Sequence, residues 1–202
     1  MNLRLTYNRI AKDWMQDHEE DIWWIGGIDK YLSFLKSNSL ILDIGCGAAI
    51  KSKYLIKKGF RVIGIDFSEE MIALAKEQAS AGHFFVKDIK QPLDLEKIFD
   101  GVLAHAVLLH IPKKEVPDVL KNIIAPLKPD GYFCVAVKEQ KPGNFDEELL
   151  KENDYGYEYE RFFSYYTLEE MENYVINVGL HIVYKNITTS GKTNWIQIIA
   201  KK

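Results

Sequence analysis

Residues 40–50 constrain the fold of this 202-residue chain more than any other stretch. The apolar run at residues 40–42 is typical of a strand that is buried on both faces, and Gly45 and Gly47 then interrupt it. From Ala49 onward apolar residues recur at helical spacing, which predicts a tight turn between the end of a strand and the start of a helix. Because glycine has no Cβ, a ligand can lie directly against such a turn. The stretch therefore predicts an α/β fold with a ligand site at this turn.

Two kinds of ligand bind to a strand, a glycine-rich turn and a helix: a dinucleotide, or the amino-acid end of S-adenosylmethionine. The dinucleotide motif needs a third glycine, and that position is Ile50, whose branched side chain would obstruct the pyrophosphate. As Asp43-x-Gly45-x-Gly47, the stretch instead resembles the first motif of class I S-adenosylmethionine-dependent methyltransferases. Ala49 stands where the family often has a further glycine. The resemblance implies cofactor contacts from the residues of this turn: Asp43, Gly45, Cys46 and Gly47.

The second predicted strand, residues 60–66, ends in Asp66. Folds of this kind place a carboxylate there to hold the ribose hydroxyls. In the methyltransferase family the next residue often packs on the adenine ring, which implies that role for Phe67, although an aromatic residue here could equally belong to the core. Ser68 is predicted to cap the following helix, whose inward residue Met71 we also include among the cofactor contacts.

The third predicted strand, residues 83–86, is followed by Asp88 and Ile89. Many relatives in the family have an aspartate and an apolar residue at this point. The resemblance implies that the carboxylate of Asp88 accepts a hydrogen bond from the adenine amino group and that the amide of Ile89 touches the ring. The alternative is that Asp88 is a solvated turn residue.

Residues 99–112 resemble the fourth strand of the family and the loop that follows it. Ligands of open α/β sheets bind off the carboxyl ends of the strands, where Ala104 is predicted to lie. His105 and His110 are the candidates for a general base, because imidazole titrates near neutral pH. A purely structural role is the alternative for each. The other histidines lack acidic or cysteine partners at ligand spacing, so we predict no metal site.

The aromatic N-terminal segment, residues 1–38, is predicted to form two helices around Gly26 and Gly27. Similar methyltransferases fold an N-terminal Tyr-x-x-x-Ala helix over the cofactor, which implies that Tyr7 and Trp14 close the site. The alternative is that these aromatic residues simply pack on the sheet.

The C-terminal part contains a polar stretch, residues 138–160, which predicts a mobile loop that contacts the substrate. Residues 180–187 and 195–200 are predicted to form a closing hairpin. The resemblance thus covers residues 40–202. It implies a Rossmann-like three-layer sandwich with a seven-stranded, mostly parallel sheet, of order 3-2-1-4-5-7-6 and with an antiparallel last strand.

Length and composition predict one domain over residues 1–202, with a helical lid at 1–38 and a core at 39–202. The 47% apolar and 27% charged content is that of a globular protein, and no apolar run is long enough to span a membrane. Because the sequence shows no secretory signal and its two cysteines suit a reducing compartment, we expect a cytoplasmic protein. The net charge of -3 argues against a broad nucleic-acid surface.

The resemblance implies an S-adenosylmethionine-dependent methyltransferase. A small-molecule acceptor is favoured, because the chain has neither a basic appendage nor the Asn-Pro-Pro-Tyr motif of base-methylating relatives. The alternatives are a tRNA methyltransferase, a non-catalytic S-adenosylmethionine-binding module and a nucleotide-dependent oxidoreductase. The sequence carries no signal for the oligomeric state.

Overall fold

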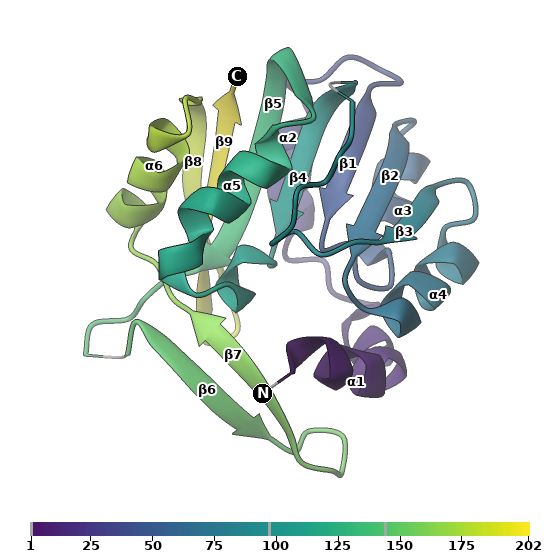
Figure 1. Cartoon of the computed structure of the whole chain (residues 1–202), viewed down its shortest axis with the longest axis vertical. Helices are drawn as coiled ribbons and strands as arrows, with labels where there is room; N and C mark the ends of the chain where they lie inside the picture. The colour runs from purple at the N-terminus through teal and green to yellow at the C-terminus, as the bar shows by residue number, and fades with distance from the viewer. Residues whose placement is uncertain (1, 97, 144) are drawn as a thin grey trace.

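A seven-stranded sheet forms the centre of the computed structural model, which describes residues 2–96, 98–143 and 145–202 (Figure 1). The strand order is β3-β2-β1-β4-β5-β9-β8. The first five strands in this order pair in parallel, and β9 pairs antiparallel with both β5 and β8. The strands are β1 (Leu40–Ile44), β2 (Arg61–Asp66), β3 (His83–Val86), β4 (Phe99–His105), β5 (Leu127–Lys138), β8 (His181–Ser190) and β9 (Thr193–Lys201). Because β6 and β7 form a separate two-stranded sheet, β8 and β9 are the sixth and seventh strands of this one. The predicted order 3-2-1-4-5-7-6, with its antiparallel last strand, is therefore confirmed.

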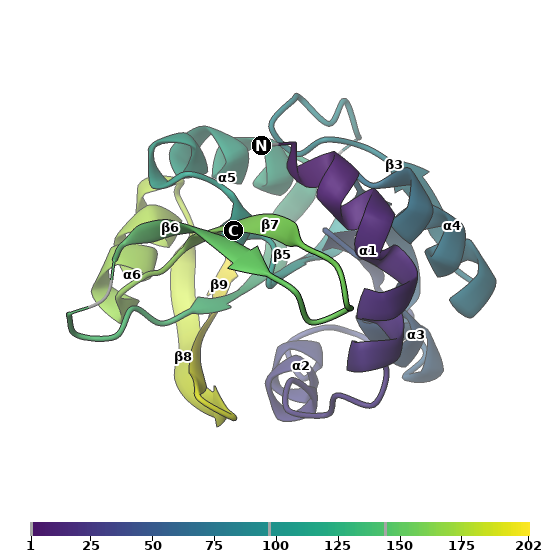
Figure 2. The same cartoon turned by 90° about the horizontal axis from the view of Figure 1, so that it is seen from below.

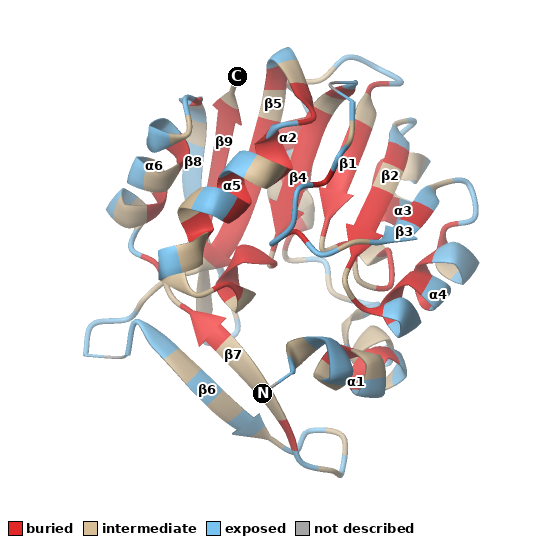
Figure 3. Cartoon of the chain, in the orientation of Figure 1, coloured by how far each residue is buried: buried red, intermediate tan, exposed pale blue. Residues whose placement is uncertain are grey.

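Helices cover both faces of the sheet. Because side chains alternate along a strand, Ile41 packs with α2 and α3 on one face while Leu42 packs with α5 and α6 on the other. The central strands are buried along most of their length, which confirms the predicted three-layer sandwich (Figure 3). The helices are α2 (Ile25–Leu32), α3 (Ile50–Lys57), α4 (Glu69–Gln78), α5 (Val116–Ile124) and α6 (Leu168–Asn177), with short 3-10 turns η1 (Leu108–His110) and η2 (Lys113–Glu115).

Two further elements lie across the carboxyl ends of the central strands: α1 (Leu3–His18) and a hairpin of β6 (Glu147–Glu152) and β7 (Tyr159–Ser164). Figure 2, seen from this end, shows them side by side. Arg9 donates a hydrogen bond to the carbonyl of Glu158 at 3.0 Å, and the hydroxyl of Tyr157 donates to Asp13 at 2.5 Å. Segments 149 residues apart in sequence therefore meet over one end of the sheet.

The prediction of a mobile loop over residues 138–160 is wrong, because β6 and the start of β7 occupy part of it. The inward side chains of β6 include carboxylates in place of apolar groups. Arg161 makes two hydrogen bonds of 2.6 Å to Glu152, and the hydroxyl of Tyr165 donates to Glu148 at 2.7 Å. Polar pairs across the hairpin thus replace the apolar alternation by which a strand is recognised in sequence.

The predicted position of Gly26 and Gly27 between two helices is also wrong, since both lie in the first turn of α2. A Cβ on Gly27 would lie 2.4 Å from the amide oxygen of Gln197, and the amide nitrogen of Gln197 donates to the carbonyl of Gly27 at 2.8 Å. Gly27 therefore leaves room for the side chain of Gln197 between α2 and β9, and it does not end a helix.

No helix in the described ranges combines the length and the apolar character that crossing a membrane requires.

Candidate functional site

A cavity lies where β1, β2 and β4 end, beneath α1. It brings together most of the residues singled out in the sequence, although these come from four separate segments. Its wall is formed by Tyr7, Trp14, Asp43, Gly45, Cys46, Gly47, Ile50, Lys51, Asp66, Phe67, Met71, His105, Ala106, Val107 and His110. Asp88, Ile89 and Ala104 lie outside this wall.

The glycine turn is shaped by close contact with the loop after β4. Gly45 has φ = +63°, and a Cβ on it would lie 2.5 Å from a methyl carbon of Val107. Both the backbone conformation and the available space therefore require glycine at this position. Ala49, at the family's further glycine position, also has a left-handed conformation, with φ = 63° and ψ = 25°. An L-residue tolerates this at a cost of about 1–2 kcal/mol.

Asp66 holds the turn against the start of α4. Its carboxylate accepts hydrogen bonds from the backbone N–H of Gly47 at 3.0 Å and of Ser68 at 2.9 Å. Burial raises the pKa of Asp66 to about 6, in spite of these bonds. A carboxylate has about four lone-pair sites, so Asp66 keeps acceptor capacity for a ligand hydroxyl. Ser68 caps α4 as predicted, because its hydroxyl accepts from the N–H of Met71 at 3.1 Å.

Asp43 lies deeper, with 2% of its surface exposed. It accepts a 2.6 Å hydrogen bond from the hydroxyl of Ser52, and burial raises its pKa to about 6. Ser52 escaped the sequence analysis because only apolar periodicity was sought in this helix. The neighbouring Lys51 also lines the cavity, and burial lowers the pKa of its ammonium group. The position of Lys51, four residues after Gly47, was the signal in the sequence that could have identified it as a site residue.

His110 joins three parts of the chain. Its Nδ1 lies 2.8 Å from the carbonyl of Phe162, which can only accept, so Nδ1 carries the proton. Burial lowers the pKa of His110 to about 3, so the ring is neutral and its Nε2 accepts from the hydroxyl of Tyr7 at 2.7 Å. The lone pair on Nε2 that a general base would use is therefore occupied by the hydroxyl of Tyr7, on α1. A catalytic role for His110 stays a prediction.

His105 is 6% exposed, and burial places its pKa well below the usual value. Its ring lies beside Trp23 and Trp195, with centroid distances of 5.2 and 6.1 Å. Its Nδ1 has no hydrogen-bond partner within the described part of the chain. His105 is therefore neutral at pH 7, and its role as a base also stays a prediction.

A second cavity adjoins the first and shares part of its wall: Tyr7, Trp14, Ile50, Lys51, Ala106 and His110. Aromatic and basic side chains form much of the remainder. These come from the α1–α2 connection, β5, β7 and β9, and they include Trp23, Trp24, Lys138, Arg161, Phe163 and Trp195. The sequence analysis assigned no role to Lys138 or Trp195, because nothing in their local pattern links these strands to a site.

The remaining predicted residues have other surroundings. Asp88 is exposed and accepts a hydrogen bond from the N–H of Lys90 at 2.9 Å. Ile89 and Ala104 are buried in the core beneath α5. Their contacts with a cofactor stay predictions. Across the described residues, no group of three or more histidine, cysteine or acidic side chains is arranged to hold a metal ion.

Comparison with known proteins gives a consistent result. The profile described as "Methyltransferase domain" matches residues 18–185. The chain is similar to a ubiquinone biosynthesis O-methyltransferase of Bradyrhizobium diazoefficiens (37% identity over 99 residues, covering 48% of this chain and 38% of the relative). It also resembles an uncharacterized methyltransferase of Staphylococcus carnosus (26% identity over 174 residues, 80% and 78% covered).

Among solved structures, the fold is similar to that of the 1,6-didemethyltoxoflavin-N1-methyltransferase of Burkholderia thailandensis. The TM-score is 0.80 at 21% identity, with 99% of this chain and 87% of the other covered. The chain spans only 38% to 44% of the length of three curated relatives at 33% to 37% identity, two of which are ubiquinone biosynthesis O-methyltransferases.

Proposed function

The chain belongs to the methyltransferase domain family, and we propose that it is a class I S-adenosylmethionine-dependent methyltransferase that acts on a small molecule. The observation that carries the proposal is the pair of adjoining cavities at the carboxyl ends of β1, β2 and β4. The first contains the glycine turn and Asp66, and the second offers room for an acceptor beside it. Similar proteins are named for methylation of small compounds.

The residues of the first cavity fit S-adenosylmethionine. The backbone around Gly45 and Gly47 is open to the amino-acid end, Asp66 has acceptor capacity for ribose hydroxyls, and Phe67 and Met71 offer apolar surface for adenine. When bound, this cofactor supplies a methyl group on a positively charged sulfur. The protein then contributes alignment and exclusion of water, since α1 covers the cavity through the bond between Tyr7 and His110.

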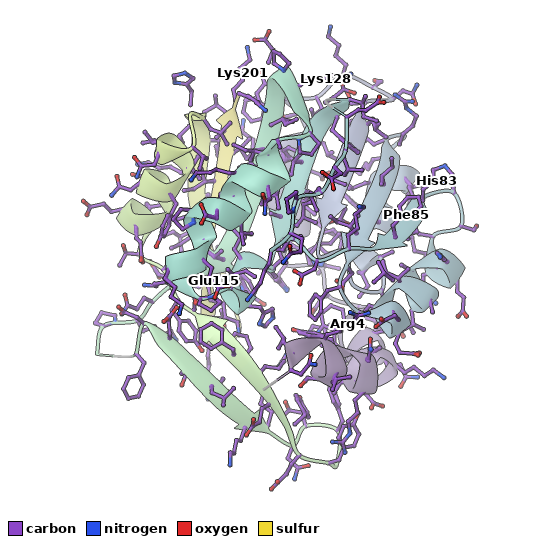
Figure 4. All side chains as sticks on the ribbon, viewed as in Figure 1. Arg4, His83, Phe85, Glu115, Lys128 and Lys201 are labelled. Atoms are coloured by element: carbon purple, nitrogen blue, oxygen red, sulfur yellow. The ribbon has the colours of Figure 1, made fainter. Side chains whose placement is uncertain are left out.

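Nucleic acid is disfavoured as the acceptor. The net charge is -3, and two basic side chains at the end of the sheet opposite α1 form ion pairs. Lys128 and Lys201, labelled in Figure 4, form ion pairs of 2.7 Å with Asp100 and Asp130. Arg4, on α1 in the same view, pairs with Glu69. The net negative charge supports a small acceptor over tRNA.

The proposal is tested by calorimetric titration of S-adenosylhomocysteine and of NAD into the purified protein. We expect a dissociation constant on the order of micromolar for S-adenosylhomocysteine. NAD should give no binding heat, because Ile50 replaces the third dinucleotide glycine. Binding of NAD without any response to S-adenosylhomocysteine would overturn the proposal. Transfer of a labelled methyl group to pools of small molecules then separates an enzyme from a non-catalytic binding module.

Cofactor affinity should depend on pH through Asp66, whose pKa burial raises to about 6. Ribose hydroxyls donate best to the ionised carboxylate. Affinity for S-adenosylhomocysteine should therefore rise between pH 5 and 7, with a slope approaching about tenfold per pH unit below the pKa. The stability of the ligand-free protein should show the opposite trend and fall as the pH rises. Because folding raises this pKa, the contribution of Asp66 to stability is greatest at low pH and is lost as pH rises toward about 6.

The matched variant is Asp66→Asn, which keeps the shape of the side chain and cannot titrate. Its affinity for S-adenosylhomocysteine should vary less with pH than that of the native protein, and Asp43, with a pKa also raised to about 6, contributes to the remaining dependence. Equal slopes in the two proteins, measured by calorimetry from pH 5 to 8, would show that Asp66 does not face the ribose.

A further inference from the structure

The second cavity has an excess of positive charge on its wall. Lys51, Lys138 and Arg161 line it, and Asp21 is the one acidic residue among its described lining residues. Arg161 is neutralised by its two 2.6 Å hydrogen bonds to Glu152. Lys51 lies in the field of Asp43 and Asp21, both of which favour its charged form. Lys51 lines both cavities, whereas Lys138 lines the second and not the first.

Lys138 has no carboxylate within ion-pair distance among the described residues. Its ammonium lies 4.1 Å from the ring centroid of Phe163 and 6.0 Å from that of Trp195. Burial, and then the charge of Arg161, lowers its pKa to about 8, although the charges of Glu152 and Glu148 act in the opposite direction. A half-buried ammonium without an ion-pair partner is costly, and an anion from outside the chain would reduce that cost.

The same cavity has several aromatic walls. Trp23 and Trp195 stack at a centroid distance of 4.4 Å with 22° between their planes, and His105 lies against both. Phe163 contributes a further ring beside Lys138. Flat apolar faces of this kind favour a planar aromatic ligand, by stacking and edge contacts.

We propose that the second cavity binds the methyl acceptor as a planar aromatic carboxylate, with Lys138 as the main contact of the anionic group. This rests on the proposed function, because the six shared wall residues bring the acceptor beside the first cavity. A singly charged anion is favoured over a doubly charged one, since Asp21 on the wall, and Glu148 and Glu152 near Lys138, would repel further negative charge. Lys138 thus selects the acceptor by its charge, and the aromatic walls select it by its shape.

The test uses 2-naphthoate and its neutral amide, 2-naphthamide, titrated calorimetrically into the protein with and without saturating S-adenosylhomocysteine. The native protein should bind the carboxylate about tenfold or more tightly than the amide. Lys138→Met should bring the two affinities to within about twofold of each other, and Lys138→Arg should keep the preference. Cyclohexanecarboxylate, which has the charge without the flat ring, should bind more weakly than 2-naphthoate.

Lys141→Met is the matched control. Lys141 is exposed three residues further along the chain, outside the wall of the cavity, so its loss should leave the preference intact. Lys138→Met removes an unpaired cation and should melt no lower than the native protein. Equal binding of amide and carboxylate by the native protein, or an undiminished preference in Lys138→Met, would overturn the inference. Neither outcome bears on cofactor binding or on methyl transfer, which the titration of S-adenosylhomocysteine and the transfer of a labelled methyl group test separately.

Discussion

Replacing Gly45 by alanine is expected to destabilise the protein by about 3 kcal/mol and to abolish measurable binding of S-adenosylhomocysteine. Two costs add. A left-handed backbone costs an L-residue about 1–2 kcal/mol, and an overpacked methyl group costs about 1–3 kcal/mol. The second cost applies because the new Cβ would lie 2.5 Å from a methyl carbon of Val107. Urea unfolding, monitored by circular dichroism, measures the loss of stability.

Gly59→Ala separates the two costs. Gly59 has φ = +87°, but a Cβ there would meet no atom within 4 Å. This variant should lose only the backbone contribution, about 1–2 kcal/mol, and should bind S-adenosylhomocysteine normally. The double variant Gly45→Ala with Val107→Ala should recover only part of the lost stability, because it removes the methyl group at 2.5 Å but keeps the Cβ of residue 107, at 2.8 Å. If Gly45→Ala and Gly59→Ala were equally stable, the contact with Val107 would not be what requires glycine.

Asp66→Ala is expected to lower the affinity for S-adenosylhomocysteine by about tenfold or more. Each charge-assisted hydrogen bond to a ribose hydroxyl is worth roughly 1.5–3 kcal/mol. The substitution also removes the acceptor of the N–H groups of Gly47 and Ser68, which loosens the turn that the ligand contacts. Asp66→Asn should be milder, since the amide keeps one acceptor and the same shape. Calorimetric titration of the folded variants measures the effect.

Asp88→Ala serves as the comparison. Asp88 is exposed, lies outside the wall of the first cavity and accepts its hydrogen bond from Lys90. Its loss should therefore cost clearly less affinity than the loss of Asp66. If Asp66→Ala bound within about twofold of the native protein, the proposed position of the ribose would be wrong, together with the register of the cofactor site.

The central sheet could be predicted from the sequence because strands buried on both faces are continuous apolar runs. Residues 40–42 are an example, and the parallel pairing of β1 with β2 and β4 follows from such runs alternating with helices. β6 could not be predicted in this way. The inward side chains of β6 include Glu148 and Glu152, and the partners that make these carboxylates acceptable lie beyond residue 158 in the sequence.

The first cavity was largely predictable for a related reason. In parallel sheets the carboxyl ends of successive strands lie at one edge, so Gly45, Asp66 and His105 converge by topology alone. The second cavity depends on packing between remote elements. Trp23, Lys138 and Trp195 come from three segments with no shared pattern, and only the folded chain brings them together. Likewise, the position of Asp66 at the end of β2 could be predicted from the sequence, whereas its hydrogen bonds to Gly47 and Ser68 could not.

The position of α1 and the β6–β7 hairpin over the carboxyl ends of the strands has a consequence for the order in which the protein folds. The walls of the second cavity extend along the chain from Tyr7 to Trp195, and the bond from Tyr7 to His110 closes a loop of 103 residues. Contacts over such separations form late in folding, because much chain entropy is lost before they add stability. A growing polypeptide would therefore acquire affinity for a ligand of the second cavity only after Trp195 has been synthesised. A cofactor analogue added during refolding would stabilise the finished protein alone, by mass action, and would not stabilise its intermediates.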